Sequence, residues 1–250
     1  MNPQLVLSDD LLLLYLDART KVLEQKDHGK LLQLLSFYKS HLTNEAQYTR
    51  IGKTLSLELN ASLLKSGISP NLSLEELAQK KTLKIILDKE KKEYPYVSID
   101  GSDKLQSCYV GNFWREPRVK CIAHLKSLCK NATSIFVYDK YLYVENRSIN
   151  DNEKLLSNIL RLMDRSRNQT LSIYDTRKSI KDEVGRIAQK CKKKFPNITV
   201  RVISSEDFAE KHDRYMVIKS TTGNVEILLS SGFDNLFEDS KDFTYLIRPI

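Results

Sequence analysis

The spacing of hydrophobic residues predicts a helical first part of the chain. Within residues 1–80 the leucines recur with the 3.6-residue period of amphipathic helices. Ser73 and Glu76 have the spacing of a capping box, which marks the start of a short helix. The predicted helices cover residues 9–25, 29–42, 45–65 and 73–79. We therefore expect residues 1–80 to form an α-helical N-terminal module.

Residues 81–130 have a mixed pattern and are interpreted as a connecting segment. Short apolar runs predict strands at 82–87 and 94–99. Tyr109–Trp114 is interpreted as an aromatic connector. Residues 118–130 then form an amphipathic helix, because their apolar side chains fall on one helical face.

Residues 131–250 alternate between strand and helix patterns. The predicted helices cover 152–165 and 180–195. The predicted strands cover 134–139, 170–175, 198–203, 215–218, 225–229 and 243–247. Strand, helix, strand, helix, strand, followed by short sequential strands, indicates a mixed β-sheet flanked by helices. The fold class predicted for the chain is therefore α/β.

Composition predicts the class of the protein and the cellular compartment in which it is found. Hydrophobic residues make up 41% and charged residues 29%, as in soluble globular proteins. No apolar run approaches the roughly 20 residues of a membrane span, and the start lacks the pattern of a signal peptide. We expect a cytoplasmic protein. Cys121 and Cys129 flank His124, but their helix is apolar on that side, so buried thiols are favoured over a metal site.

Positive charge is concentrated in one stretch of the second part. The net charge is +8, and residues 154–194 contain 12 basic and 4 acidic side chains. Such a concentration is consistent with binding of a polyanion such as DNA or RNA, and equally with a solvated helix face. The predicted contacts to phosphate are Arg177, Lys178, Arg186, Lys190, Lys193 and Lys219.

One short segment concentrates residues capable of phosphate chemistry. His212 and Arg214 stand two apart at the start of a predicted strand, so they point to the same face. The turn after the next strand returns Ser231 and Asn235 toward them. Two further predicted strands end in aspartates, Asp139 and Asp175, and the carboxyl ends of parallel strands are where open sheets bind ligands. The two carboxylates could also bind a metal, a hypothesis that the sequence supports less.

This arrangement resembles the motif of the phospholipase D superfamily. That motif is a histidine, any residue, a lysine, an apolar strand, a further acid and a Gly-Ser-x-Asn turn. His212 matches the histidine that attacks phosphorus, Arg214 stands at the lysine, and Ser231 and Asn235 stand near the turn. The resemblance covers about half of the chain. The His-Asp-Arg-aromatic form of the motif is similar to that of divergent members in bacterial defence and mobile-element proteins. It is also similar to that of a phospholipid-binding domain found beside MIT domains.

The resemblance implies a metal-independent phosphodiesterase or nuclease that works through a phosphohistidine. No metal and no other cofactor is implied, because a neutral imidazole can attack the phosphodiester itself. The active site of the family uses two such motifs and only one occurs here, so an active protein is expected to be a homodimer.

The chain departs from the motif at two positions. Lys219 stands where the family has its acid, and Arg214 replaces the family's lysine. Tyrosyl-DNA phosphodiesterases also lack that acid and remain active. The alternative function is therefore a degraded module that binds the phosphate of nucleic acid or lipid headgroups. A third reading assigns the function to residues 1–80 as a protein-interaction module.

Overall fold

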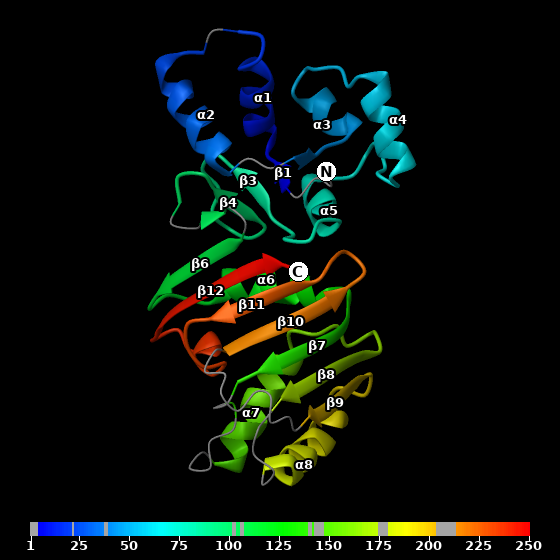
Figure 1. The fold of residues 1–250 in the computed structure, drawn as a ribbon, viewed down its shortest axis with the longest axis vertical. Helices are drawn as coiled ribbons and strands as arrows, with labels where there is room; N and C mark the ends of the chain where they lie inside the picture. Colours follow the sequence, from blue (N-terminus) through cyan, green and yellow to red (C-terminus); the bar gives the residue numbers. More distant parts are fainter. Residues whose placement is uncertain are drawn as a thin grey trace. The chain divides into compact units, whose positions relative to one another are not determined.

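The computed structural model describes residues 5–21, 23–37, 40–101, 104–105, 108–139, 142, 148–174, 180–203 and 214–250, with the backbone alone at 104–105 and 180–183 (Figure 1). The chain divides into two compact units, Met1–Tyr109 and Val110–Ile250. Sheets flanked by helices confirm the predicted α/β class. Within the described residues, no helix is both long enough and apolar enough to cross a membrane.

The first unit is built on a small parallel sheet. Its strands follow the order β2-β1-β3-β4. They are β1 (Leu5–Leu7), β2 (His41–Leu42), β3 (Ile86–Asp88) and β4 (Tyr96–Ser98). Strand β1 precedes the first predicted helix, and β2 occupies the last two residues of the predicted helix 29–42, because the observed helix ends at Phe37. Two or three residues are too few to show an alternating pattern, and β1 is buried on both faces, as parallel strands usually are.

Helices accompany this sheet, and side-chain caps begin several of them. They are α1 (Asp9–Asp17), α2 (Gln25–Phe37), α3 (Glu45–Arg50), α4 (Leu57–Lys65) and α5 (Leu74–Gln79). The predicted capping box of Ser73 and Glu76 is present at α5. Val6 and Ile86, on neighbouring strands, pack with Leu77 of α5 in one apolar cluster. The burial of this cluster ties the last helix to the sheet.

The second unit contains most of a mixed sheet with the order β5-β6-β12-β11-β10-β7-β8-β9. Strands β7, β8 and β9 are parallel, and β10, β11 and β12 run antiparallel to their neighbours. The bounds are β5 (Lys104–Leu105), β6 (Tyr109–Trp114), β7 (Ala132–Tyr138), β8 (Gln169–Tyr174), β9 (Ile198–Ile203), β10 (Arg214–Ser220), β11 (Val225–Leu229) and β12 (Asp242–Pro249). The predicted mixed sheet is therefore confirmed, and the aromatic connector is strand β6.

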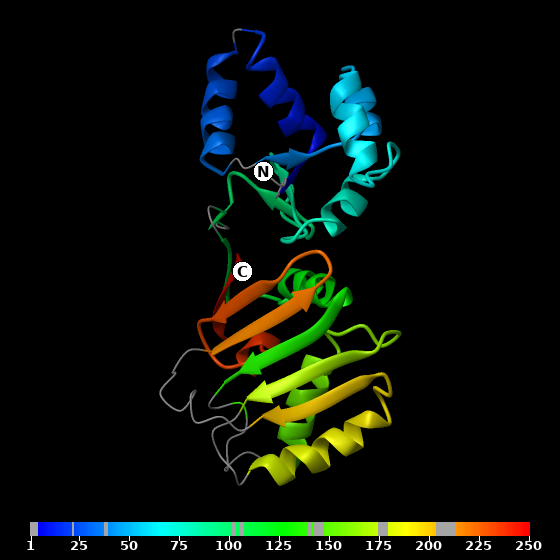
Figure 2. The same cartoon turned by 45° about the vertical axis from the view of Figure 1, so that its right-hand side comes forward.

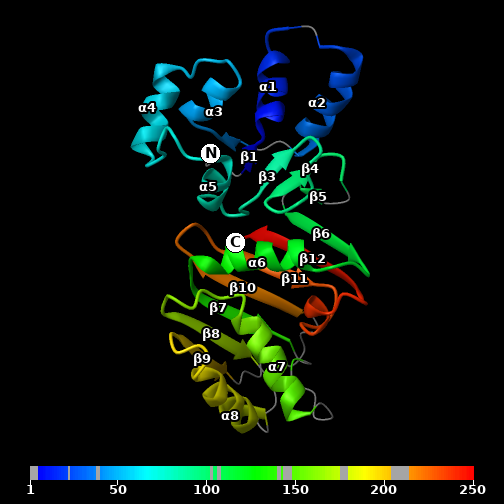
Figure 3. The same ribbon diagram turned by 180° about the vertical axis from the view of Figure 1, so that it is seen from behind.

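Three helices cover the same face of this sheet. They are α6 (Val119–Lys130), α7 (Ile149–Leu160) and α8 (Ile180–Lys192). Figure 3 shows α6 and α7 in front of the strands, whereas Figure 2 shows the strands from their other face. Ile135, Val137 and Met216 are buried toward the helices, while the alternating Phe136 and Tyr138 are only half-buried. The sheet is thus apolar toward the helices and more polar on the opposite face.

Candidate functional site

The strand order brings several chain segments to one end of the second sheet. Parallel strands β7, β8 and β9 end there, β10 begins there, and β11 ends there, because Tyr215 pairs with Tyr138 and Arg214 pairs with Leu229. We call this end the carboxyl edge. In sheets of this kind, ligands bind at the carboxyl ends of parallel strands.

Arg214 and Asp139 form an ion pair at the carboxyl edge. The Nε atom of Arg214 lies 3.4 Å from Oδ1 of Asp139, and the side chains are 28% and 1% exposed, respectively. The other carboxylate oxygen, Oδ2, accepts a hydrogen bond from the backbone N–H of Phe233 at 3.4 Å. A carboxylate this deeply buried requires a positive partner, and Arg214 supplies it. Arg214 therefore forms a salt bridge with Asp139 at this edge.

The turn after β11 packs directly against this ion pair. A methyl group added at Gly232 would lie 2.4 Å from Oδ1 of Asp234 and 3.9 Å from Oδ2 of Asp139. That Oδ1 atom accepts a hydrogen bond from the backbone N–H of Asn235 at 3.1 Å. A larger residue at position 232 would therefore force the Asp234 carboxylate to move. The sequence motif gave no signal for this contact, because it identified the turn by its serine and asparagine.

Ser231 and Asn235, two predicted site residues, lie in the same turn. The hydroxyl of Ser231 is inaccessible to solvent and has no hydrogen-bond partner among the described residues. Asn235 begins a short 3₁₀ helix, η2 (Asn235–Phe237), and its backbone N–H also donates to the carbonyl of Gly232 at 3.0 Å. The structure thus places Arg214 and both turn residues at the same edge of the sheet.

A row of tyrosines borders the carboxyl edge on the face opposite the helices. Tyr215, Tyr138 and Tyr174 occupy matching positions on β10, β7 and β8. The ring centroids are 4.2 Å apart for Tyr138 and Tyr215 and 4.3 Å apart for Tyr138 and Tyr174, with nearly parallel planes. Burial and a hydrogen bond with Tyr174 raise the pKa of Tyr138 far above its ordinary value. The phenol of Tyr138 therefore stays protonated at physiological pH. The tyrosine of each Tyr-Asp strand end is the signal that could have found two members of the row.

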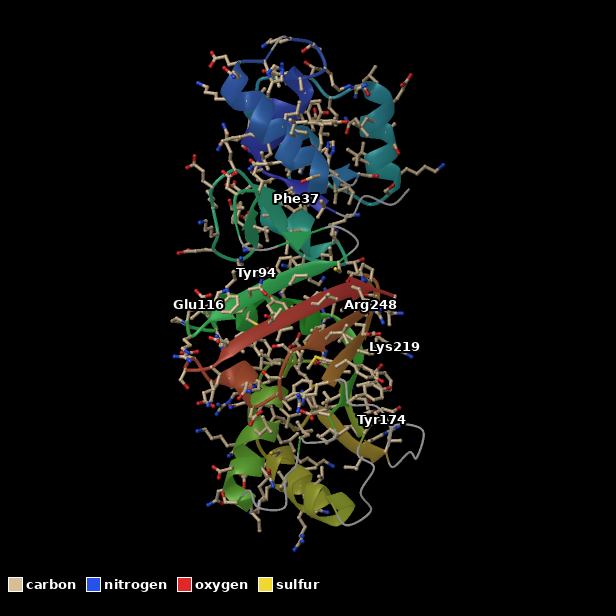
Figure 4. The ribbon with its side chains drawn as sticks, turned by 60° about the vertical axis from the view of Figure 1, so that its left-hand side comes forward. Phe37, Tyr94, Glu116, Tyr174, Lys219 and Arg248 are labelled. Atoms are coloured by element: carbon tan, nitrogen blue, oxygen red, sulfur yellow. The ribbon has the colours of Figure 1, made fainter. Side chains whose placement is uncertain are left out.

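Lys219 does not join Arg214 at the carboxyl edge. It lies five residues farther along β10, about 17 Å away at the usual rise of a strand, and points to the opposite face. Its Nζ atom sits 5.1 Å from the centroid of the Phe136 ring. Figure 4 labels Lys219 together with Tyr174 and Arg248, and the three side chains lie along one side of the sheet.

The basic residues of α8 lie toward the other end of the strands. This helix leaves the carboxyl edge after β8 and returns the chain to the start of β9, so its last turn lies near the amino end of the sheet. Lys190 in this last turn contacts Glu153 of α7 at 3.6 Å, and Lys193 follows the helix. Arg186 is exposed at mid-helix. Three predicted residues, His212, Arg177 and Lys178, lie outside the described residues, as does Asp175.

The cysteines near His124 are buried, as expected. Burial raises the pKa of the Cys129 thiol to about 12 and that of the Cys121 thiol still further. Nδ1 of His124 lies 3.1 Å from the hydroxyl of Tyr245, so this ring is held in the core. In the part of the chain that the structure describes, no group of three or more His, Cys, Asp or Glu side chains is placed to hold a metal ion.

A polar cavity of about 320 Å³ lies beside the turn. Its lining comes from α7 and from the segment around η2, and includes Asp151, Lys154, Asp234 and Glu238. Three carboxylates against one ammonium group repel a phosphate. This cavity is therefore not the phosphate site implied by the motif.

Comparison with known proteins leaves the family of this chain open. No protein-family model matches it, and no curated protein matches it. Among solved structures, it is similar to a polyphosphate kinase from Porphyromonas gingivalis, with 11% sequence identity and a TM-score of 0.35. The match covers 56% of this chain and 23% of that chain. The function is therefore argued from the residues of the carboxyl edge.

Proposed function

We propose that the second unit binds phosphodiesters of nucleic acid at the carboxyl edge and cleaves them without a metal ion. The observation that supports this most is the strand register, which places Arg214 beside the end of β7 and opposite the end of β11, where the turn carrying Ser231 begins. His212 precedes Arg214 by two residues in the chain. The four residues assigned to the site are His212, Arg214, Ser231 and Asn235.

In this proposal Asp139 orients the guanidinium of Arg214. A guanidinium offers two edges to its partners, and the edge that carries Nε lies on the Asp139 side, with Nε 3.4 Å from Oδ1. The edge formed by its two Nη atoms is the one suited to grip two phosphate oxygens. An exposed fraction of 28% for this side chain gives a phosphate access from solvent. The Ser231 hydroxyl and the Asn235 amide then complete the cradle.

The proposed reaction uses the imidazole of His212 as the nucleophile. One ring nitrogen attacks phosphorus, a P–N bond forms, and the bond from phosphorus to the leaving oxygen breaks. The leaving oxygen takes a proton from the imidazolium of His212 in a second copy of the chain. Water then gives a proton to that second imidazole and attacks phosphorus, the P–N bond breaks, and the product is a phosphate monoester. Arg214 stabilises the charge that develops on the phosphate oxygens in both steps.

A binding module without catalysis is the second candidate, and two observations favour it. Lys219 occupies the position of the family's acid, but it lies five residues from Arg214 along β10 and points to the opposite face of the sheet, where it contacts Phe136. Arg214 is already paired with a buried carboxylate, which lowers the net positive charge offered to a phosphate. A module of this kind would bind the phosphates of nucleic acid or lipid headgroups through Arg214 without breaking a bond.

A cleavage assay in EDTA separates the two candidates. The full chain is incubated with fluorescent single-stranded DNA and RNA, and His212→Ala is compared with His28→Ala, which changes an exposed helical histidine of the first unit. Cleavage that persists in EDTA, survives in His28→Ala and falls by about 10³-fold or more in His212→Ala supports the enzyme. Cleavage that requires a divalent metal, or that continues in His212→Ala, refutes it. Salt-sensitive binding without cleavage, weakened in Arg214→Lys, supports the module.

A further inference from the structure

An open groove runs between α8 and strand β9 in the second unit. Its volume is about 240 Å³. Strand β9 is the last strand on its side of the sheet, and within the described residues it pairs with β8 alone. The groove is lined by Leu160, Gly185, Ala188, Gln189, Cys191, Lys192, Phe195, Ile198, Thr199 and Val200.

The part of the groove formed by α8 is the flank opposite Lys190, and Leu160, the last residue of α7, also lines the groove. Lys190 and Lys194 are directed toward α7, where they contact Glu153 at 3.6 and 3.8 Å. Gly185, Ala188 and Lys192 follow a spacing of three and then four residues, which places them in one stripe on the opposite flank. The groove therefore follows the free side of β9.

The shape of the groove suits one additional strand. An edge strand presents unpaired backbone N–H and C=O groups along its free side. Val200 and Val202 alternate toward the helix-covered face but remain partly exposed, unlike their partners Leu171 and Ile173 on β8. A methyl group added at Gly185 would meet nothing within 4 Å. A strand paired with β9 would thus cover the two valines and place side chains into the groove.

The charge around the groove selects an acidic occupant. Residues 186–203 contain six basic side chains and no acidic one. Two of them face Glu153, whereas Lys192 lines the groove and Lys193 and Arg201 are exposed. A second copy of β9 is disfavoured, because pairing about a twofold axis would bring two positively charged rims together.

We propose that the free edge of β9 binds an extended acidic segment of another protein by strand addition. Backbone hydrogen bonds to β9 supply the pairing, and apolar side chains of the segment fill the groove over Gly185 and Ala188. Arg201 alternates to the face away from the groove, so the outward carboxylates of the segment meet Arg201, and a carboxylate at the end of the groove meets Lys192. This inference is independent of the phosphate site, because the groove lies beside α8 and β9 and uses none of the four residues assigned there.

The test measures binding of a fluorescein-labelled decapeptide in which glutamate alternates with valine or threonine and a pair of glutamates stands at each end, so that carboxylates reach both faces there. Gly185→Leu fills the groove and replaces a glycine within a helix by a good helix former, so the variant stays folded. Lys192→Glu reverses the charge of the rim, and Lys154→Glu makes the same change on an exposed site of α7. Fluorescence anisotropy gives the affinities at low salt, and hydrogen exchange reports on the amides of residues 198–203.

The expected result is a dissociation constant at least tenfold weaker in Gly185→Leu and in Lys192→Glu, with little change in Lys154→Glu. The peptide should slow exchange in residues 198–203, and N-methylation of its alternate amides on one edge should abolish binding. Equal affinity for wild-type and Gly185→Leu would overturn the proposal, as would binding that leaves exchange in β9 unchanged. The proposal would also be overturned if oligothymidylate displaced the peptide and Lys192→Glu lost binding of the oligonucleotide but kept binding of the peptide. That result would assign the basic residues beside the groove to nucleic acid.

Discussion

The Nε atom of Arg214 lies 3.4 Å from Oδ1 of Asp139, and the two side chains differ sharply in exposure. The carboxylate is 1% exposed and the guanidinium 28% exposed. Loss of the cation beside Asp139 therefore lowers the free energy of unfolding, because water does not reach the buried carboxylate to solvate its charge. This asymmetry makes the two halves of the ion pair separable by mutation.

Loss of Arg214 should destabilise the second unit more than loss of the charge on Asp139. We expect Arg214→Gln to lower the free energy of unfolding by on the order of 3 kcal/mol, because the buried carboxylate is left without a cation. Asp139→Asn should cost less, since the partly exposed guanidinium can turn to water. Urea unfolding followed by the fluorescence of Trp114, the single tryptophan and a residue of β6, measures both.

The double variant Asp139→Asn/Arg214→Gln serves as the control for that comparison. Removal of both charges should restore part of the stability lost in Arg214→Gln alone. If the two single variants are equally destabilised and their effects add in the double variant, the ion pair is not what holds this edge together.

Gly232→Ala should disturb the turn at the carboxyl edge. The new methyl group would meet the Asp234 carboxylate at 2.4 Å, so that side chain must move and give up its hydrogen bond to the Asn235 N–H. We expect a loss of about 1 kcal/mol in the free energy of unfolding, the usual net value of one such hydrogen bond. Thermal unfolding of purified variants gives the change.

A second glycine of the same unit provides the matched control. Gly185 lies in helix α8, and an added methyl group there meets nothing within 4 Å. Gly185→Ala should therefore stabilise the protein by about 0.5–1 kcal/mol through helix propensity. Combining Gly232→Ala with Asp234→Ala should remove the clash, so the double variant should lose less stability than the two single variants lose together. A loss equal to or greater than that sum would contradict this explanation.

The first unit should lose stability in mild acid because of His41. Burial lowers the pKa of this histidine below its ordinary value of 6.5, so the unfolded chain binds the proton more readily than the folded one. Stability conferred by the neutral ring is complete above about pH 6.5 and falls as the pH drops toward the folded pKa, by up to about 1.4 kcal/mol per pH unit. Hydrogen exchange of the amides of Leu5–Leu7, corrected for the intrinsic effect of pH, follows this change.

Replacement of His41 should remove that pH dependence. In His41→Gln the protection of Leu5–Leu7 should vary much less between pH 7.5 and 5.5 than in the wild type. The same substitution at the exposed His28 keeps His41 in place and should leave the pH dependence intact. An unchanged dependence in His41→Gln would show that another group is responsible.

The sequence predicted the second unit better than the first, and the reason lies in element length. Strands β9 and β11 have the predicted bounds, because five or six alternating residues give a clear period. The strands β1 and β2 of the first unit have three and two residues and show no period. Their place in a parallel sheet depends on contacts between distant parts of the chain, which a local pattern does not contain.

The candidate site was predictable only in part. Alternation and the hairpin bring Arg214 and Ser231 to one edge, and both features can be read from the chain. Net charge could not distinguish that edge from the far end of α8, where Lys190 contacts Glu153. The close approach of the Asp234 carboxylate to Gly232 exists only in the folded state.

The most direct test of the phosphodiesterase proposal is to trap its covalent intermediate. The full chain is mixed with a labelled oligonucleotide in EDTA, quenched in alkali, which preserves a phosphohistidine, and digested for mass spectrometry. The account predicts a nucleotide adduct on His212 that is absent in His212→Ala and disappears on mild acid treatment. Cleaved oligonucleotide with no adduct on His212, or an adduct on a different residue, would contradict it.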